Sequence, residues 1–459
     1  MKISCDIDIK HLTRVEGHGN IRIVIEDGQV REARWEVVET PRFFEAILVG
    51  KHFENAPYLC GRICGICSIG HTLASIRAVE NGFGITPTVQ TGRLRLLLKH
   101  METLQSHILH IYFLAAPDYL GVGSVLPLTQ SHPAVVQQAL RLKLLANDIC
   151  DEVGGRRLHP TRTVVGGFTM LPDRYRLGQF RQRLQASLAD LDASVELFRT
   201  FSIPDFQRET EFVSLKGNGD YPFIGGDLIS TDGVVKKEQE YAAMTNEYMA
   251  EWSTSKLSRL SRKSLAVGAL ARINNNFAGL LPEAKVIAEE LGLVPVTARD
   301  AGHGRPSVVR ARDGERATGL IPWEPGMAGA VNHNPFMNVV AQLVECVQVV
   351  LESIQLIDDL LAVPWQELRQ TVAVREGIGV AAVEVPRGIL YHCLHLDAAG
   401  RIVKADCVIP TSQNHANIRH DIEDLAVFCV NQGKTDKEIE LLAEMLVRAY
   451  DPCISCSVH

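Results

Sequence analysis

The sequence has no run of 18 or more apolar residues, and we therefore expect no membrane-spanning helix. The N-terminus has no long apolar stretch behind Lys2, so we also expect no signal peptide. Positive charge is not in excess, because 47 lysines and arginines are set against 54 aspartates and glutamates, which gives a net charge of −7. A chain with this charge balance is not expected to bind nucleic acid.

The cysteines do not have the pattern of a disulfide framework. Of the eleven, four form two close pairs, Cys60 lies beside one pair, and six are isolated. This arrangement is typical of metal-binding thiols in a reducing compartment, so we expect a cytoplasmic protein. Buried apolar cysteines are common, and we assign no metal ligation to Cys5, Cys60, Cys150, Cys346, Cys393 or Cys429.

The sequence also lacks internal repeats, low-complexity tracts and Pro/Ser-rich linkers. Its length allows two or three domains of ~150 residues, but the missing linkers favour one integrated domain over residues 1–459. Alternating apolar residues predict an N-terminal hairpin at about 18–38 and a second hairpin at about 380–410.

Helical periodicity predicts the remaining elements, at 41–50, 72–82, 88–114, 133–151, 173–200, 234–251, 282–291, 335–361, 415–432 and 435–450. The predicted fold is therefore α-rich (α+β). It has a long central helix bundle, with a helical core at about 72–361, and small N-terminal and C-terminal β-sheets. The histidines of the long helix, His100, His107 and His110, are interpreted as packed or surface residues in preference to a proton path.

Two cysteine pairs lie near opposite ends of the chain, Cys64 with Cys67 and Cys453 with Cys456. Two residues separate the thiols of each pair, a spacing that lets a turn direct both sulfurs at one ion. Four converging thiolates would form a soft-metal site. Since Cys456 is three residues from the last residue, it is a useful ligand only if the tail 451–459 is packed inside. A buried terminal carboxylate needs a cation beside it, which indicates a second, harder metal there.

Three alternatives for these cysteines remain open at this point. One is structural zinc, although the pairs of a zinc ribbon lie about 15–20 residues apart and Cys67 and Cys453 are 386 positions apart. Another is a C-terminal pair that is disordered or redox-active by itself. The third is the iron–sulfur loop of a radical S-adenosylmethionine enzyme, whose spacing Cys60, Cys64 and Cys67 match. That enzyme class needs a parallel α/β barrel, and the chain lacks the strand–helix alternation of one.

Five short stretches follow one another along the whole chain: Arg14-Val15-Glu16-Gly17-His18, Arg62-Ile63-Cys64-Gly65-Ile66-Cys67 with His71, Val385-Pro386-Arg387-Gly388, Val408-Ile409-Pro410-Thr411, and Asp451-Pro452-Cys453-Ile454-Ser455-Cys456 with His459. Together, and in this order, they resemble the large, catalytic subunit of nickel–iron hydrogenases. The resemblance implies an oxidoreductase that reversibly splits H2 into protons and electrons.

The resemblance also implies a nickel–iron centre with carbon monoxide and cyanide ligands on the iron. Cys64 and Cys453 would be terminal nickel ligands, and Cys67 and Cys456 would bridge nickel to iron. Thiolates suit nickel and low-spin iron, and the family's ligand set leaves positions open for H2.

A magnesium ion is implied beside this centre. Glu45, the main-chain carbonyl of Cys407 and His459 would hold it together with water molecules, which would satisfy the need for a cation at the buried tail. Glu16 would be the proton relay, because a carboxylate at a glycine-rich bend can move between a sulfur and a water chain.

Further residues would surround the metals. Arg387 would place its guanidinium over them and bond a cyanide nitrogen, and Thr411 would bond the other cyanide. Pro386 would form a wall of the pocket. His71 would donate to a bridging sulfur, and Asp451 would support the site or cap the turn before Pro452.

One residue departs from the family pattern. Many membrane-linked members carry an aspartate that pairs with the active-site arginine, in a stretch like Gln105–His110, and this chain has Ser106 at that position. We therefore expect Arg387 to lack that carboxylate partner. Together with Pro41-Arg42-Phe43-Phe44-Glu45, the change resembles the cytoplasmic, multi-subunit branch that couples H2 to soluble electron carriers.

The leftover cysteines form no group that could hold an iron–sulfur cluster, so the sequence predicts a partner, an iron–sulfur small subunit. Further flavin or electron-carrier subunits are expected from the resemblance. The competing function is a hydrogen-sensing relative with low turnover.

Overall fold

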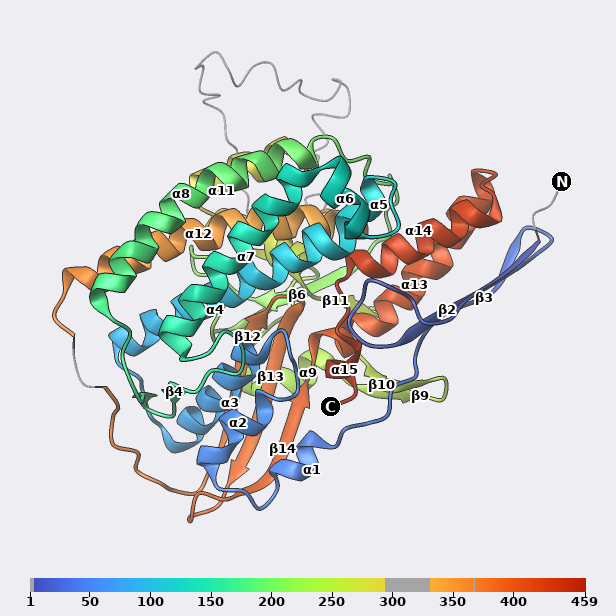
Figure 1. Ribbon diagram of the computed structural model, residues 1–459. Helices are drawn as coiled ribbons and strands as arrows, with labels where there is room; N and C mark the ends of the chain where they lie inside the picture. Colours follow the sequence, from blue (N-terminus) through green and yellow to red (C-terminus); the bar gives the residue numbers. More distant parts are fainter. Residues whose placement is uncertain (1–3, 294–330, 366–367) are drawn as a thin grey trace.

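The computed structural model of the protein describes residues 4–293, 331–365 and 368–459. Its centre is a bundle of long helices in which α4 and α12 lie side by side, with α7 and α8 packed against them (Figure 1). Their bounds are Val89–Leu109 for α4, Pro133–Gly154 for α7, Arg174–Phe198 for α8 and Asn338–Ala362 for α12. The four corresponding sequence predictions are confirmed. The part of the predicted helical core at 294–330 lies outside the described residues.

Helix α4 begins where the Thr88 hydroxyl accepts the backbone N–H of Thr91 at 3.1 Å, an N-cap that satisfies one free donor of the first turn. Its apolar residues are buried against the bundle. After Leu109 the chain continues as a π-helix, His110–Ala115. Such π-turns are rare and are often found at functional sites.

Helix α12 is the core helix of the bundle. With the turn before it, over Pro335–Ala362, it is the one helix of the described residues that is long and apolar enough to cross a membrane, with a mean hydropathy of 1.5. However, 78% of that window is buried inside the protein, and its buried face carries Gln342 and Glu345. A helix that buries hydrogen-bonded polar groups in this way behaves as a protein core helix.

Arg272 on α10 (Ala269–Asn276) ties α12 to the C-terminal sheet. Its guanidinium makes two bonds to Glu345, at 2.6 and 2.7 Å, and one to Glu384 at 2.9 Å. It also donates to the carbonyls of Val385, at 3.0 Å, and Pro386, at 3.2 Å. The arginine therefore holds the strand end that leads into Arg387.

Arg272→Met is expected to lower the free energy of unfolding by about 3–5 kcal/mol, because it leaves Glu345 and Glu384 buried without their cation. Urea unfolding followed by circular dichroism measures the change. The control is Arg181→Met, which breaks the exposed pair with Asp358 and is expected to cost less than about 1 kcal/mol. Equal unfolding midpoints for the two variants would contradict this account.

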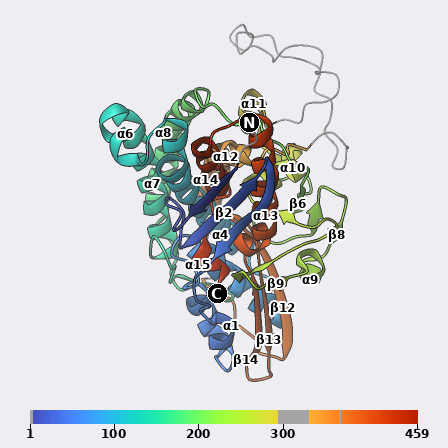
Figure 2. The same ribbon diagram turned by 90° about the vertical axis from the view of Figure 1, so that its right-hand side faces the viewer.

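The N-terminal sheet has the strand order β1-β2-β3, all antiparallel. The strands are Cys5–Ile9, Gly19–Glu26 and Gln29–Val37. The predicted hairpin at 18–38 is therefore confirmed, and β1 adds a strand that was not predicted from the sequence. Alternate residues of β2 are buried, and the sheet packs against α13 (Pro410–Asn431), where His415 Nε2 lies 2.9 Å from the Trp35 carbonyl (Figure 2).

The C-terminal sheet contains β12 (Gly377–Val385), β13 (Gly388–Leu396) and β14 (Ile402–Val408) in that order. The predicted turn at Asp397–Gly400 joins β13 to β14. The tighter turn at Pro386–Arg387, which joins β12 to β13, was not predicted. Helix α3 (Ser68–Phe83) packs on this sheet, so the Cys67 loop lies near the Arg387 turn.

The predicted helix at 234–251 is wrong. The segment contains β8 (Val235–Lys236), the short helix α9 (Tyr241–Thr245) and β9 (Tyr248–Ala250). Asn246 has a left-handed φ of 37° and ends α9, and strand pairing of β8 with β7 overrides the helical composition of this stretch.

The remaining elements are short or connect the larger ones. They are α1 Phe44–Leu48, α2 Ala56–Cys60, α5 Ala116–Tyr119, α6 Val125–Ser131, α11 Pro282–Glu290, α14 Asp436–Ala449, α15 Ile454–Ser457, β4 Thr163–Val164, β5 Gly167–Phe168, β6 Glu211–Leu215, β7 Leu228–Ser230, β10 Ser253–Leu257 and β11 Leu265–Ala266. Among strand pairs of the described residues only β6 with β11 is parallel. This topology does not support the radical S-adenosylmethionine alternative, which needs a parallel barrel.

Candidate metal centre

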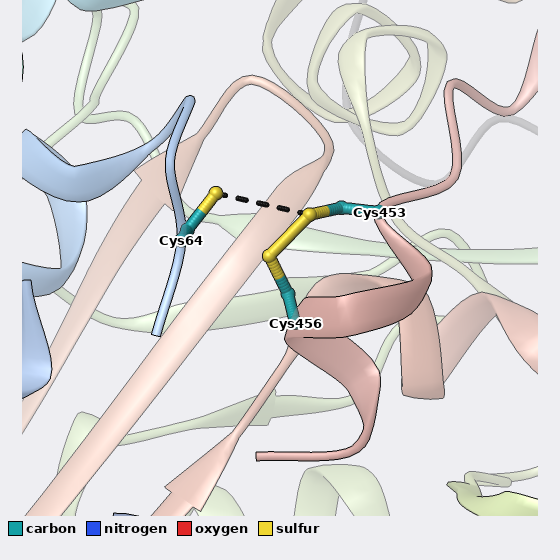
Figure 3. Close-up of side chains that lie close together, drawn as sticks. All are labelled: Cys64, Cys453 and Cys456. Atoms are coloured by element: carbon teal, nitrogen blue, oxygen red, sulfur yellow. Dashed lines mark hydrogen bonds between the residues drawn. A yellow bond between two sulfur atoms is a disulfide. The ribbon is translucent and has the colours of Figure 1, made fainter. Parts of the chain in front are cut away.

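The four cysteines of the two pairs meet inside the protein. Cys64 Sγ lies 3.7 Å from Cys453 Sγ (Figure 3), and the sulfurs of Cys64, Cys453 and Cys456 all lie within 4.8 Å of one another. Cys67, Cys456 and a ring nitrogen of His71 form a second group within the same distance. The four cysteines are at most 3% exposed. The alternative of a disordered C-terminal pair is therefore wrong.

The state of the C-terminal pair differs from the sequence prediction. Cys453 and Cys456 are joined by a disulfide (Figure 3), whereas the prediction has both as thiolate ligands. Metal ligation needs deprotonated, reduced sulfur, so this bond has to be reduced before the two residues can act as ligands.

The Cys64–Cys67 loop is organised around one sulfur. Cys64 Sγ accepts the backbone N–H groups of Ile66, at 3.3 Å, and Cys67, at 3.0 Å. Burial raises the pKa of the Cys64 thiol, but the hydrogen bond with Cys67 and the positive charge of Arg387 outweigh it, so the net shift is downward. The pKa of Cys67 moves the other way, because of its hydrogen bond with Cys64 and its burial. The loop thus favours a thiolate at Cys64.

Glu16 lies directly against the C-terminal tail. Its backbone forms a parallel bridge with Cys453, and its carbonyl accepts the Ile454 N–H at 2.9 Å. One carboxylate oxygen accepts the Ser455 N–H at 3.1 Å, and the other accepts the Ser455 hydroxyl. Gly17, with a φ of +86°, makes this approach possible, because a Cβ there would come within 2.7 Å of Ile454 Cβ. Ser455 was not among the site residues predicted from the sequence.

Arg387 has a carboxylate partner after all. Its Nε donates to the Asp451 carbonyl at 2.5 Å and its Nη2 to Asp451 Oδ1 at 2.7 Å, with both residues buried. The expectation drawn from Ser106, that Arg387 lacks an acidic partner, is thus corrected: Asp451 supplies one. Burial lowers the pKa of Arg387, but the charges of Asp451, Cys67 and Cys64 raise it further. Its Nη1 is buried without a hydrogen-bond partner in the described residues.

Thr411 and Pro386 both line the buried region around the cysteines. Thr411 Oγ1 accepts the Cys453 N–H at 3.0 Å, so its own hydrogen is left to donate elsewhere. Pro386 is buried, and its carbonyl is held by Arg272. These positions agree with the places predicted for them from the sequence, beside the metal-binding sulfurs.

Glu45, Cys407 and His459 also come together. The Cys407 N–H donates to Glu45 Oε1 at 2.8 Å, and His459 Nε2 lies 3.5 Å from the same oxygen. Burial raises the pKa of Glu45, but the contacts with His459 and with the Cys407 N–H outweigh it and lower the pKa to about 2. An ionised carboxylate beside an imidazole is a suitable donor set for a hard cation.

His392 is a further buried residue of this region that was not predicted from the sequence. It lies on β13 opposite Cys407 of β14, and its Nε2 is 3.2 Å from Nδ1 of His71. Its Nδ1 has no partner among the described residues. Burial, with the neighbouring positive charge of His459, lowers the pKa of His392 to about 3, so the imidazole is neutral. His392 therefore links the sulfur group to the Glu45 group.

Comparison with known proteins identifies the class of this fold and site. Residues 42–148 and 333–459 match the family model described as nickel-dependent hydrogenase, and residues 6–40 match the model described as HoxL-like. The chain belongs to the nickel-dependent hydrogenase family, in which it is a large, catalytic subunit. It is therefore an oxidoreductase.

Its relatives cover nearly the whole chain. The alpha subunit of sulfhydrogenase 1 from Pyrococcus furiosus is 33% identical over 455 residues, which cover 99% of this chain and 97% of the relative. A subunit of the F420-non-reducing hydrogenase from Methanothermobacter marburgensis is 28% identical, with 99% and 94% covered. The crystal structure of an NAD+-reducing NiFe hydrogenase in the H2-reduced state superposes with a TM-score of 0.79 at 25% identity, with 99% of this chain and 100% of that chain covered.

Proposed function

We propose that the chain catalyses the reversible heterolytic cleavage of H2 into two protons and two electrons. The observation that carries this proposal is the meeting of four buried cysteine sulfurs, from opposite ends of a hydrogenase-family chain, around one point. Cys64 and Cys453 are the proposed terminal nickel ligands, and Cys67 and Cys456 are the proposed bridges to an iron that carries carbon monoxide and cyanide. Such a centre, when bound, splits H2 and accepts its electrons.

The residues present fit this group. The donor set consists of four sulfurs, which soft or borderline metals prefer, and Arg387 Nη1 is a buried donor with no partner in the described residues. We propose that Nη1 and the Thr411 hydroxyl hold the two cyanide nitrogens and that Pro386 closes the pocket. The neutral His71 imidazole would donate to a bridging sulfur through the ring nitrogen that does not face His392.

Glu16 is the proposed proton carrier. Its carboxylate lies against the tail that carries Cys453, and Ser455 holds both of its oxygens. A carboxylate in this place can take the proton released at the Cys453 sulfur and pass it outward. Glu45, the Cys407 carbonyl and His459 are proposed to hold Mg2+, which would anchor the tail.

Electrons have to leave through a partner. In the described residues the groups of His, Cys, Asp and Glu that could hold a metal all belong to the site above, so no second centre is available as an electron path. We propose an iron–sulfur small subunit, with further flavin or electron-carrier subunits, in the cytoplasm. The names of two relatives, as alpha and beta subunits, agree with a multi-subunit enzyme.

The purified chain without partners is expected to show little H2-dependent reduction of a viologen dye, because its buried centre has no electron path to the surface. Co-expression with the small subunit should restore dye reduction. The measurement is dye absorbance under H2, with metal analysis of both samples to show equal nickel and iron. Full-rate dye reduction by the loaded chain alone would refute the need for a partner.

The reaction itself is tested on the complete complex. Infrared bands of metal-bound carbonyl and cyanide, equimolar nickel and iron, and rapid H2/D2O exchange are the expected results. A complex that contains zinc in place of nickel and iron, and shows no such bands, would reject the proposed function. Bands with very slow exchange would favour the hydrogen-sensing alternative.

A further inference from the structure

Asp451 is held in an unusual backbone conformation beside Arg387. Its φ of 50° is left-handed, a region that costs a residue with a side chain about 1 kcal/mol or more. Its N–H donates to the Arg448 carbonyl at 2.8 Å, and its own carbonyl accepts Arg387 Nε. A strained residue keeps one position only if its surroundings hold it there.

Two further buried side chains complete a closed ring around Asp451. Gln342 Nε2 on α12 donates to Asp451 Oδ2 at 3.4 Å, and Gln342 Oε1 lies 2.5 Å from His110 Nδ1. His110 Nε2 lies 2.7 Å from the Arg448 carbonyl, the same carbonyl that accepts the Asp451 N–H. We call Asp451, Arg448, His110 and Gln342 the Asp451 ring. His110 and Gln342 are at most 1% exposed.

The π-helix places His110 in this ring and ties the ring to the Glu16 loop. The Leu114 carbonyl accepts Arg14 Nη1 at 2.7 Å, two residues before Glu16. Arg14 and Arg448 both bind Asp118, at 2.5 and 3.0 Å. One segment therefore supports the two chain regions on which the proposed proton carrier and the active-site arginine depend.

We propose that Gln342 and His110 are positioning residues for Arg387. The ring holds the Asp451 carboxylate, and Asp451 Oδ1 with the Asp451 carbonyl then holds the guanidinium through Nη2 and Nε. This leaves Nη1 as the guanidinium nitrogen that is free for the metal-bound group. The inference rests on the proposed function, because it concerns how Arg387 meets that group.

Ser106 makes the ring more important in this chain. Asp451 is the one acidic side chain paired with Arg387 in the described residues, and the buried Ser106 hydroxyl has no partner there. An arginine with a single carboxylate partner takes its orientation from that carboxylate. The residues that orient Asp451 consequently decide where Arg387 points.

The test compares Gln342→Met with Gln348→Met in the complete complex. Gln348 is a matched control, because it is a buried glutamine on the same helix whose side chain accepts the Leu281 N–H and donates to Glu352, each at 2.8 Å. Gln342→Met is expected to keep nickel and iron, to shift the infrared cyanide bands, and to lower turnover about 10- to 100-fold, the size expected for a misplaced catalytic group. Gln348→Met should leave bands and turnover unchanged.

A double variant tests whether the ring acts as a unit. His110→Phe should shift the same bands, and His110→Phe with Gln342→Met should lower turnover no further than either single change, because the ring is already open. Unshifted cyanide bands in Gln342→Met, equal shifts in Gln348→Met, or multiplied losses in the double variant would each overturn the inference.

Two outcomes remain separate from this one. If the wild-type complex lacks carbonyl and cyanide bands, the proposed function fails, not the ring. If Gln342→Met does not accumulate, Gln342→Glu keeps the side-chain length and sets a carboxylate against Asp451. It is expected to shift the cyanide bands, and unshifted bands would overturn the inference.

Discussion

Replacing Cys456 by serine is expected to abolish nickel and iron together. In the proposed centre its sulfur bridges both metals, and a serine hydroxyl is a hard, poorly ionised donor that neither metal accepts in place of a thiolate. The variant complex should contain background levels of both metals and show no infrared carbonyl or cyanide bands. Cys67→Ser should give the same result.

The matched control is Cys60→Ser. Cys60 is fully buried and lies four residues from Cys64 in the chain, and burial raises its pKa to about 12, so it stays a thiol. The same chemical change there should leave both metals in place. Loss of nickel with retention of iron in Cys456→Ser would contradict the bridging assignment, and metal loss in Cys60→Ser would show a general effect on folding.

The sequence predicted the long helices and both terminal sheets, because each has a clear local pattern. Periodic apolar residues define α4 and α12, and alternation defines β2 and β3. The segment 234–251 could not be predicted in this way, because pairing of β8 with β7 and the left-handed Asn246 decide its structure. Strand β1 was missed because its partner β2 follows a long loop, not a tight turn.

The cysteines could be predicted because their spacing and the surrounding motifs are local in sequence. The supporting contacts could not, since they join residues far apart in the chain. Gln342 and Asp451 are 109 positions apart, and His71 and His392 are 321 apart. Nothing near Ser455 in the sequence indicates that it binds Glu16, although a hydroxyl between two proposed ligands was a signal that could have been followed.

Glu16→Gln is expected to stop proton exchange and to spare metal loading. The amide has nearly the same shape and still accepts a hydrogen bond from Ser455, so the tail should stay in place. It cannot take up a proton as a carboxylate does, and a positioned general base is worth about 10²- to 10⁴-fold in rate. H2/D2O exchange should therefore fall by that factor, while nickel, iron and the infrared bands stay as in the wild type.

Glu39→Gln separates this role from a general charge effect. Glu39 Oε1 lies close to Gly17 and accepts the His18 N–H at 2.9 Å, but it does not bind Ser455. Removal of its charge should leave exchange nearly unchanged. If Glu39→Gln slowed exchange as much as Glu16→Gln, the negative charge of the loop would be the important quantity. If Glu16→Gln exchanged at the wild-type rate, the proton would have to leave the Cys453 sulfur by a route that does not use this carboxylate.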